Sequence, residues 1–184
     1  MIARLKQAGP FMVFFAALVV IQGVHMFEHV VQLLQVTVFN VAEDDALGLL
    51  GYVLAIQGTE EWLHLGFNGT YLLGLLALVV PMWRRVPTLL PMSAFVIFAA
   101  GVGLETWHGA EHAVIISNVI ANDGCPCPGI VDSRTGLSDT FLHFGYNAAV
   151  YATVVFAFVY VVRARRRGAH PYTSAPVASA AAQM

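Results

Sequence analysis

The chain has 184 residues, of which 58% are hydrophobic and only 11% charged, whereas globular domains have about 45–50% and about 25% respectively. Its mean hydropathy is +0.72. This composition excludes a disordered segment, a nucleic-acid-binding arm and an ordinary water-soluble enzyme, and the length leaves no room for several domains of about 100–200 residues each. The sequence therefore predicts a small integral membrane protein.

Four apolar stretches are long enough to cross a bilayer as helices, which takes roughly 20 residues for a core about 30 Å thick. We predict spans over residues 11–38, 62–80, 91–119 and 141–162. Pro81, Pro87 and Pro91 are expected to mark the turn between the second and third spans, because proline cannot continue a helix. These spans predict one all-α membrane domain over residues 1–168, followed by a disordered tail over 169–184.

The basic residues predict the orientation of the spans. Eight of the nine fall in three places that four spans bring to one side: Arg4 and Lys6, Arg84 and Arg85, and Arg163, Arg165, Arg166 and Arg167. Because basic loops stay in the cytoplasm, we expect both termini to be cytoplasmic and the protein to lie in the plasma (inner) membrane. The expected partners are the lipid bilayer and other membrane subunits, not nucleic acid.

Two polar motifs occur twice in the same order. Residues 25–29 read H-M-F-E-H and residues 108–112 read H-G-A-E-H, while 63–68 read L-H-L-G-F-N and 142–147 read L-H-F-G-Y-N. Four positions before the histidine of the second motif stand Glu60 and Asp139. The pattern predicts a tandem duplication of a two-helix hairpin, with repeats over about 11–80 and 91–162, that builds a four-helix transmembrane bundle.

Helical spacing directs these residues to shared faces, because positions i, i+3 and i+4 of a helix lie together. Counting 1.5 Å per residue, six histidines fall in one layer about 10 Å thick towards the extracytoplasmic face. We predict metal ligation by His25, Glu28, His29, His64, His108, Glu111, His112 and His143. We expect Glu60 and Asp139 to orient histidines or relay protons, and Asn68, Asn147 and Glu105 to orient ligands or contact a substrate.

A structural network is the alternative explanation of this layer. A single histidine in a membrane span is usually an interhelical hydrogen-bonding group. An unpaired carboxylate in a bilayer costs about 2.5–3.5 kcal/mol on insertion scales, so a histidine and glutamate network that only joins helices, or only relays protons, would be an expensive device. Metal ligation is the favoured interpretation.

Imidazole and carboxylate ligands suit iron, copper, manganese or zinc. The His25/His29 and His108/His112 spacing resembles the histidine boxes of membrane desaturases and hydroxylases, which are iron enzymes, and Asp139/His143 is similar to ligand spacing in copper membrane monooxygenases. H-x-x-E-H also resembles the inverzincin peptidase pattern. Each resemblance covers a few residues and indicates a class of chemistry, not a family. We expect one or two transition-metal ions, iron or copper in preference to zinc.

The only two cysteines, Cys125 and Cys127, lie in the second outer loop with one residue between them. A disulfide between such close neighbours would be strained. A soft-metal site, a redox pair and a rigid loop with incidental cysteines all remain open.

These observations lead to one functional hypothesis and two alternatives. The first is a non-haem, metal-dependent oxidoreductase that acts on a small or lipophilic substrate. The second is uptake or delivery of metal ions, suggested by the acidic residues and cysteines of the outer loops. The third is a b-type haem electron carrier, since four-helix membrane cytochromes ligate haem through histidines on facing helices. One glutamate for each pair of histidines disfavours haem, which needs an apolar pocket.

Overall fold

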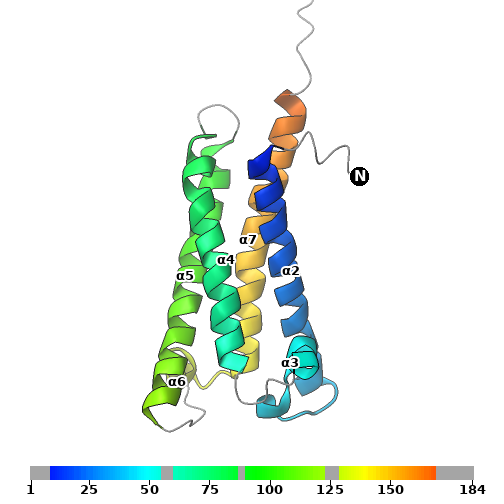
Figure 1. The fold of residues 1–184 in the computed structure, drawn as a ribbon, viewed down its shortest axis with the longest axis vertical. Helices are drawn as coiled ribbons and strands as arrows, with labels where there is room; N and C mark the ends of the chain where they lie inside the picture. Colours follow the sequence, from blue (N-terminus) through cyan, green and yellow to red (C-terminus); the bar gives the residue numbers. More distant parts are fainter. Residues whose placement is uncertain (1–8, 55–59, 87–89, 123–128, 169–184) are drawn as a thin grey trace, which may run out of the picture.

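The computed structural model describes residues 9–54, 60–86, 90–122 and 129–168, and all regular secondary structure in these ranges is helical. Four long helices lie side by side: α2 (Pro10–Thr37), α4 (Glu60–Trp83), α5 (Met92–Ala121) and α7 (Asp139–Gly168) (Figure 1). Three short helices connect them: η1 (Glu43–Asp45), α3 (Gly48–Leu54) and α6 (Asp132–Thr135). Each long helix therefore covers a predicted span to within one residue and extends beyond it at one or both ends.

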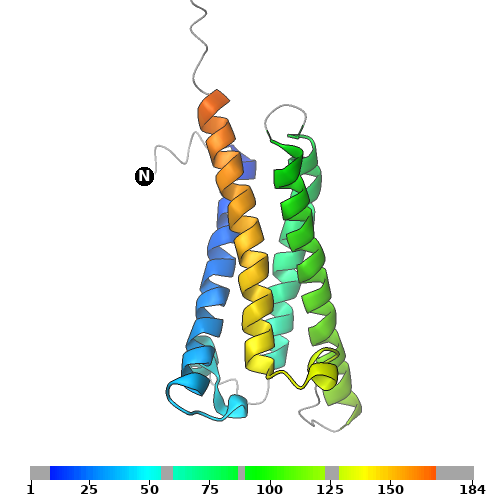
Figure 2. The same cartoon turned by 180° about the vertical axis from the view of Figure 1, so that it is seen from behind.

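The long helices form a closed arrangement in which each has two neighbours. Helix α7 packs against both α2 and α5, and α4 also packs against both of them. Seen from behind, α7 lies between α2 and α5 (Figure 2). One face of every long helix therefore points to a common interior.

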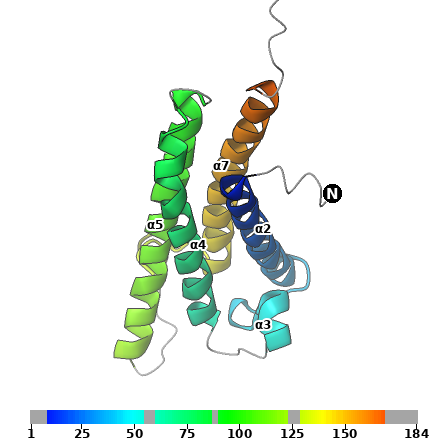
Figure 3. The same ribbon diagram turned by 45° about the horizontal axis from the view of Figure 1, so that its top comes forward.

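The two ends of the structure differ in charge. The start of α2, the end of α4, the start of α5 and the end of α7 lie at one end, while α3 and α6 lie at the other (Figures 1 and 3). Arg84, Arg85 and the arginines of the last turn of α7 belong to the first end. Glu43 and Asp45 in η1 belong to the second. We call these the basic end and the loop end.

Three helices are long and apolar enough to cross a membrane: Pro10–Thr37, Trp62–Trp83 and Asp139–Arg167. Within the described residues α5 is not among them, because Glu105, His108, Glu111 and His112 lower its hydropathy. Large apolar side chains are exposed on the outside of the helices, Val20 and Leu73 among them, while polar side chains are buried. This distribution is the reverse of that in a water-soluble protein and fits a lipid environment.

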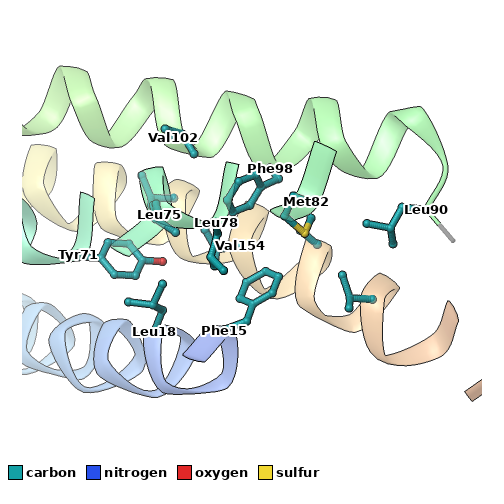
Figure 4. Packing of buried hydrophobic residues seen from close by; sticks show 13 residues of the cluster. Phe15, Leu18, Tyr71, Leu75, Leu78, Met82, Leu90, Phe98, Val102 and Val154 are labelled. Atoms are coloured by element: carbon teal, nitrogen blue, oxygen red, sulfur yellow. The ribbon is translucent and has the colours of Figure 1, made fainter. Parts of the chain in front are cut away.

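A compact apolar core fills the interior near the basic end (Figure 4). Phe15 lies at its centre, with its ring edge-on to Phe98 at 6.0 Å and to Phe158 at 5.2 Å between centroids. The other buried members include Leu18, Tyr71, Leu75, Leu78, Met82, Leu90, Val102 and Val154. This core closes the interior between the basic end and the polar residues nearer the loops.

The expectation that Pro81 ends the second span is wrong, since α4 continues to Trp83. Proline cannot donate to the carbonyl four residues earlier and its ring crowds that carbonyl, yet the chain stays helical for two residues after Pro81. The carbonyl of Pro81 accepts a hydrogen bond from Arg85 Nη1 at 2.6 Å, and the Arg85 guanidinium lies 3.7 Å from the centroid of the Phe11 ring. These contacts stabilise the last turn of the helix.

Candidate metal centre

Six histidines from the four long helices meet in the interior on the loop side of the apolar core. Neighbouring rings lie 4.4–6.3 Å apart between centroids. Every one of these side chains is buried. The set consists of His25 and His29 on α2, His64 on α4, His108 and His112 on α5, and His143 on α7. Residues separated by up to 118 positions, the difference between 25 and 143, thus share one cluster.

Three of the six have ligand atoms close enough to share a metal ion. The donor atoms of His108, His112 and His143 all lie within 4.8 Å of one another. Among the described residues this is the one group of histidine, cysteine and carboxylate side chains with that geometry. We call these three residues the second trio, because all belong to the second motif pair.

Carboxylates lie behind two members of the second trio. Asp139 Oδ1 is 3.0 Å from His143 Nδ1, and Glu105 Oε2 is 3.6 Å from His108 Nδ1. A carboxylate that accepts a hydrogen bond from one ring nitrogen fixes the ring orientation and makes the other nitrogen a better ligand. Asp139 lies within hydrogen-bond distance of His143 Nδ1, so Nε2 is the nitrogen that His143 would offer to a metal. The contact between Glu105 and His108 is too long for a hydrogen bond. The structure thus brings Asp139 and Glu105 next to histidines, and their role in orienting ligands stays a prediction.

His25, His29 and His64 form a corresponding first trio. His25 Nε2 and His29 Nε2 lie 3.3 Å apart. The His64 ring is 5.7 Å from His25 and 5.2 Å from His29 between centroids. The first trio lies directly beside the second, because the His64 ring is 5.6 Å from that of His112 and 6.2 Å from that of His143.

The two motif glutamates have a different environment from the one that the sequence suggested. Glu28 Oε1 accepts the backbone N–H groups of Leu50 at 2.6 Å and Gly51 at 3.3 Å in helix α3. Glu111 Oε1 accepts the N–H of Val131 at 2.8 Å, just before α6. Neither glutamate belongs to the group with metal-binding geometry. Each therefore ties a segment at the loop end to the helical turn that carries two clustered histidines.

Both ties require a glycine in the loop. A Cβ atom at Gly48 or at Gly129 would collide with Oε1 of Glu28 or Glu111 respectively. Gly48 also has a φ of 68°, a left-handed conformation that side chains disfavour. The same device thus occurs at corresponding places in the two halves of the chain.

We expect Gly129→Ala to destabilise the folded protein by about 1–3 kcal/mol, since the added methyl group displaces the Glu111 carboxylate from the part-buried N–H of Val131. The measurement is thermal unfolding in detergent. Gly103→Ala is the matched control, because a Cβ there meets no atom within 4 Å. Equal melting temperatures for the two variants would contradict the proposed contact.

A second polar layer lies between the histidines and the apolar core. Gln22 Nε2 donates to Asn147 Oδ1 at 2.8 Å, and Asn147 Nδ2 donates to the backbone oxygen of His143 at 2.9 Å. Asn68, Tyr71 and Glu105 are also buried, and their polar side-chain atoms have no hydrogen-bond partner among the described residues. The Asn147 side chain thus contacts the predicted ligand His143 at the backbone oxygen of that histidine. The Asn68 side chain has no such contact in the described part of the chain.

Sequence analysis did not identify the aromatic residues of the site. The Phe67 ring stacks on His25 at 5.0 Å, and the Tyr146 ring stacks on His108 at 5.2 Å between centroids. Phe67 and Tyr146 occupy the same position of the repeated L-H-x-G-[F/Y]-N motif. Because both stand directly before the motif asparagine, the repeat could have indicated that these two aromatic residues belong to the site. Tyr71 stands three residues after Asn68, about one helical turn, so helical spacing could have predicted that the two side chains share a buried face.

Three predicted residues remain untested by this geometry. Cys125 and Cys127 lie outside the described residues, as does the side chain of Glu60. Their predicted contributions to metal capture or to orientation of His64 therefore stay predictions.

No family model matches the chain, and searches of curated proteins and of solved structures find no similar protein.

Proposed function

We propose that this protein binds a transition-metal ion within the membrane through His108, His112 and His143 and uses it for non-haem oxidoreductase chemistry. The observation that supports this most directly is the convergence of three buried imidazoles whose donor atoms lie within 4.8 Å. The Asp139 carboxylate, 3.0 Å from His143 Nδ1, supports it further, because such a partner is typical of metal-ligating histidines.

The chemistry of the donors narrows the choice of metal. Three imidazoles leave coordination positions open, which is the arrangement of catalytic sites. Nitrogen donors without thiolates suit iron, copper or zinc, and iron or copper would supply redox chemistry. A substrate that reaches this buried position from the bilayer or the loop end is small or lipophilic. Asp139, whose side chain is 45% exposed, is the group best placed to exchange protons with solvent.

The proposal includes a topology with four spans and both termini in the cytoplasm. The arginines at the basic end favour a cytoplasmic location for that end, so the histidines would lie towards the outer face of a plasma membrane. The paired loop ties of Glu28 and Glu111 and the paired aromatic stacks of Phe67 and Tyr146 support an origin by tandem duplication.

The packing disfavours the two alternative functions. An ion path across the membrane would have to pass the core around Phe15, Leu75 and Phe98, whose side chains have no exposed surface. Haem would need a slot for a porphyrin between its axial ligands. The six histidine rings pack directly on one another, with neighbouring centroids no more than 6.3 Å apart. Retention of a metal for catalysis therefore fits this interior better than transport or haem binding.

The test is elemental analysis with an optical spectrum of detergent-purified protein, with His108→Gln/His143→Gln as the variant. We expect stoichiometric iron or copper in the wild type and its loss in the variant, whose fold is checked by size-exclusion chromatography. Zinc alone would contradict the redox proposal. The same metal content in both proteins would exclude the second trio as the site.

A further inference from the structure

We propose that the first trio, His25, His29 and His64, holds a second metal ion, so that the protein contains a two-ion centre. This inference rests on the proposed function and specifies the number of ions and the ligands of each. It concerns three buried histidines that the site at His108, His112 and His143 does not use.

The spacing of two nitrogens carries the inference. His25 Nε2 and His29 Nε2 lie 3.3 Å apart. The contact meets the criteria of a hydrogen bond between the two rings, although it is longer than the most frequent distance of about 2.9–3.0 Å. Two nitrogens bound at about 2.0–2.1 Å to one tetrahedral ion lie about 3.3–3.4 Å apart. The His25/His29 pair is therefore spaced for ligation of a shared ion.

The surroundings of this pair match those of the second trio. His25 stacks on Phe67 as His108 stacks on Tyr146, with centroid distances of 5.0 and 5.2 Å. On the same turns, Glu28 and Glu111 each hold an outer loop. His64 contacts both His25 and His29, so it is the third ligand available from the neighbouring helix. A pair of histidines one helical turn apart, with a third histidine on the neighbouring helix, thus occurs in both halves of the chain, although among the described residues only the second trio has all three donor atoms within 4.8 Å.

The two trios are close enough to form a single centre. His64 of the first trio lies beside His112 and His143 of the second, at 5.6 and 6.2 Å between ring centroids. His29 lies 6.3 Å from His143. Because the ligand rings of the two trios are in contact, two ions held by them would share one interior and could act on one substrate.

The trios differ in one charge, and this difference predicts their order of filling. Glu105 stands three residues before His108, while the neutral Gln22 stands three residues before His25. The Gln22 amide is already engaged with Asn147. A nearby carboxylate stabilises a bound cation, so the second trio fills first and the first trio binds its ion more weakly.

The experiment is titration of metal-free protein in nanodiscs with Co²⁺, followed by its ligand-field absorption and by calorimetry. We expect about two equivalents in two steps of different affinity. The variants His25→Gln/His29→Gln and His64→Gln are each expected to lose the weaker step and keep the tighter one. The retained step shows that the variant is folded. In Mn²⁺-loaded wild type, electron paramagnetic resonance is expected to show coupled ions.

One equivalent of Co²⁺ in the wild type would overturn the second site and leave the proposed function standing. Two equivalents retained in both variants would also overturn it, since the weaker ion would then be bound elsewhere. No binding in the wild type would overturn the inference together with the proposed function.

Discussion

Replacement of His112 by alanine is expected to lower the affinity of the tighter metal site by more than about 100-fold. Loss of a group that merely orients a ligand already costs 10–100-fold in affinity, and His112 is itself one of three proposed ligands. Its ring also contacts members of both trios, with centroid distances of 4.4 Å to His143 and 5.6 Å to His64. The variant therefore removes a donor at the point where the two halves meet.

The measurement is the dissociation constant for Co²⁺, obtained by competition with a chelator in detergent solution. The matched control is His170→Ala, which removes the one histidine of the chain that belongs to neither trio. This control is expected to bind Co²⁺ as the wild type does. Wild-type affinity in the His112 variant, or an equal loss in the control, would contradict the assignment of the tight site to the second trio.

The helical fold followed from elementary rules. A run of about 20 apolar residues in a membrane must form a helix, because no water is present to bond its backbone. Each predicted span lies largely within a long helix, but the ends were less accurate. The fourth helix continues to Gly168 beyond the predicted limit at residue 162, since the arginines that follow are good helix formers and interact favourably with its C-terminus.

The meeting of the six histidines was predictable because helical periodicity fixes the face of each residue and the rise per residue fixes its depth. The orientation of Glu28 and Glu111 was not. Their carboxylates lie on the same faces as the histidines but reach backbone N–H groups of loops that are about 20 residues away in sequence. No spacing rule predicts such a contact, because it depends on how a loop folds back over the helix ends.

The aromatic stacks have a similar origin. Phe67 and Tyr146 are next to the motif asparagines, but their contacts with His25 and His108 depend on which helices are neighbours. Sequence periodicity predicts which residues share one face of a helix, but it does not predict which other helix packs against that face. The repeated motif could have indicated these contacts. A motif position that is aromatic in both halves of the chain is a candidate for the same contact in each half.

Glu105→Gln is expected to have two opposite effects: metal affinity at the second trio falls 10–100-fold, while metal-free protein becomes more stable by about 1 kcal/mol. Affinity falls because the carboxylate that faces His108 Nδ1 at 3.6 Å loses its charge. Stability rises because both oxygens of Glu105 are buried without a hydrogen-bond partner among the described residues. The variant no longer buries this carboxylate, and in the other half of the chain the amide at the matching position, Gln22, is accommodated by a hydrogen bond to Asn147.

The first motif already has a glutamine at the position of Glu105, which supports the expected gain in stability of the metal-free protein. Gln22 stands at the corresponding position of the first motif and donates to Asn147, whose counterpart is Asn68. Thermal unfolding of metal-free protein and Co²⁺ affinity are the paired measurements, with Asp139→Asn as the comparison. Asp139 is 45% exposed and already contacts His143, so its variant is expected to lose affinity without gaining stability. A Glu105 variant that is less stable and binds Co²⁺ normally would show that this carboxylate serves the fold and not the metal.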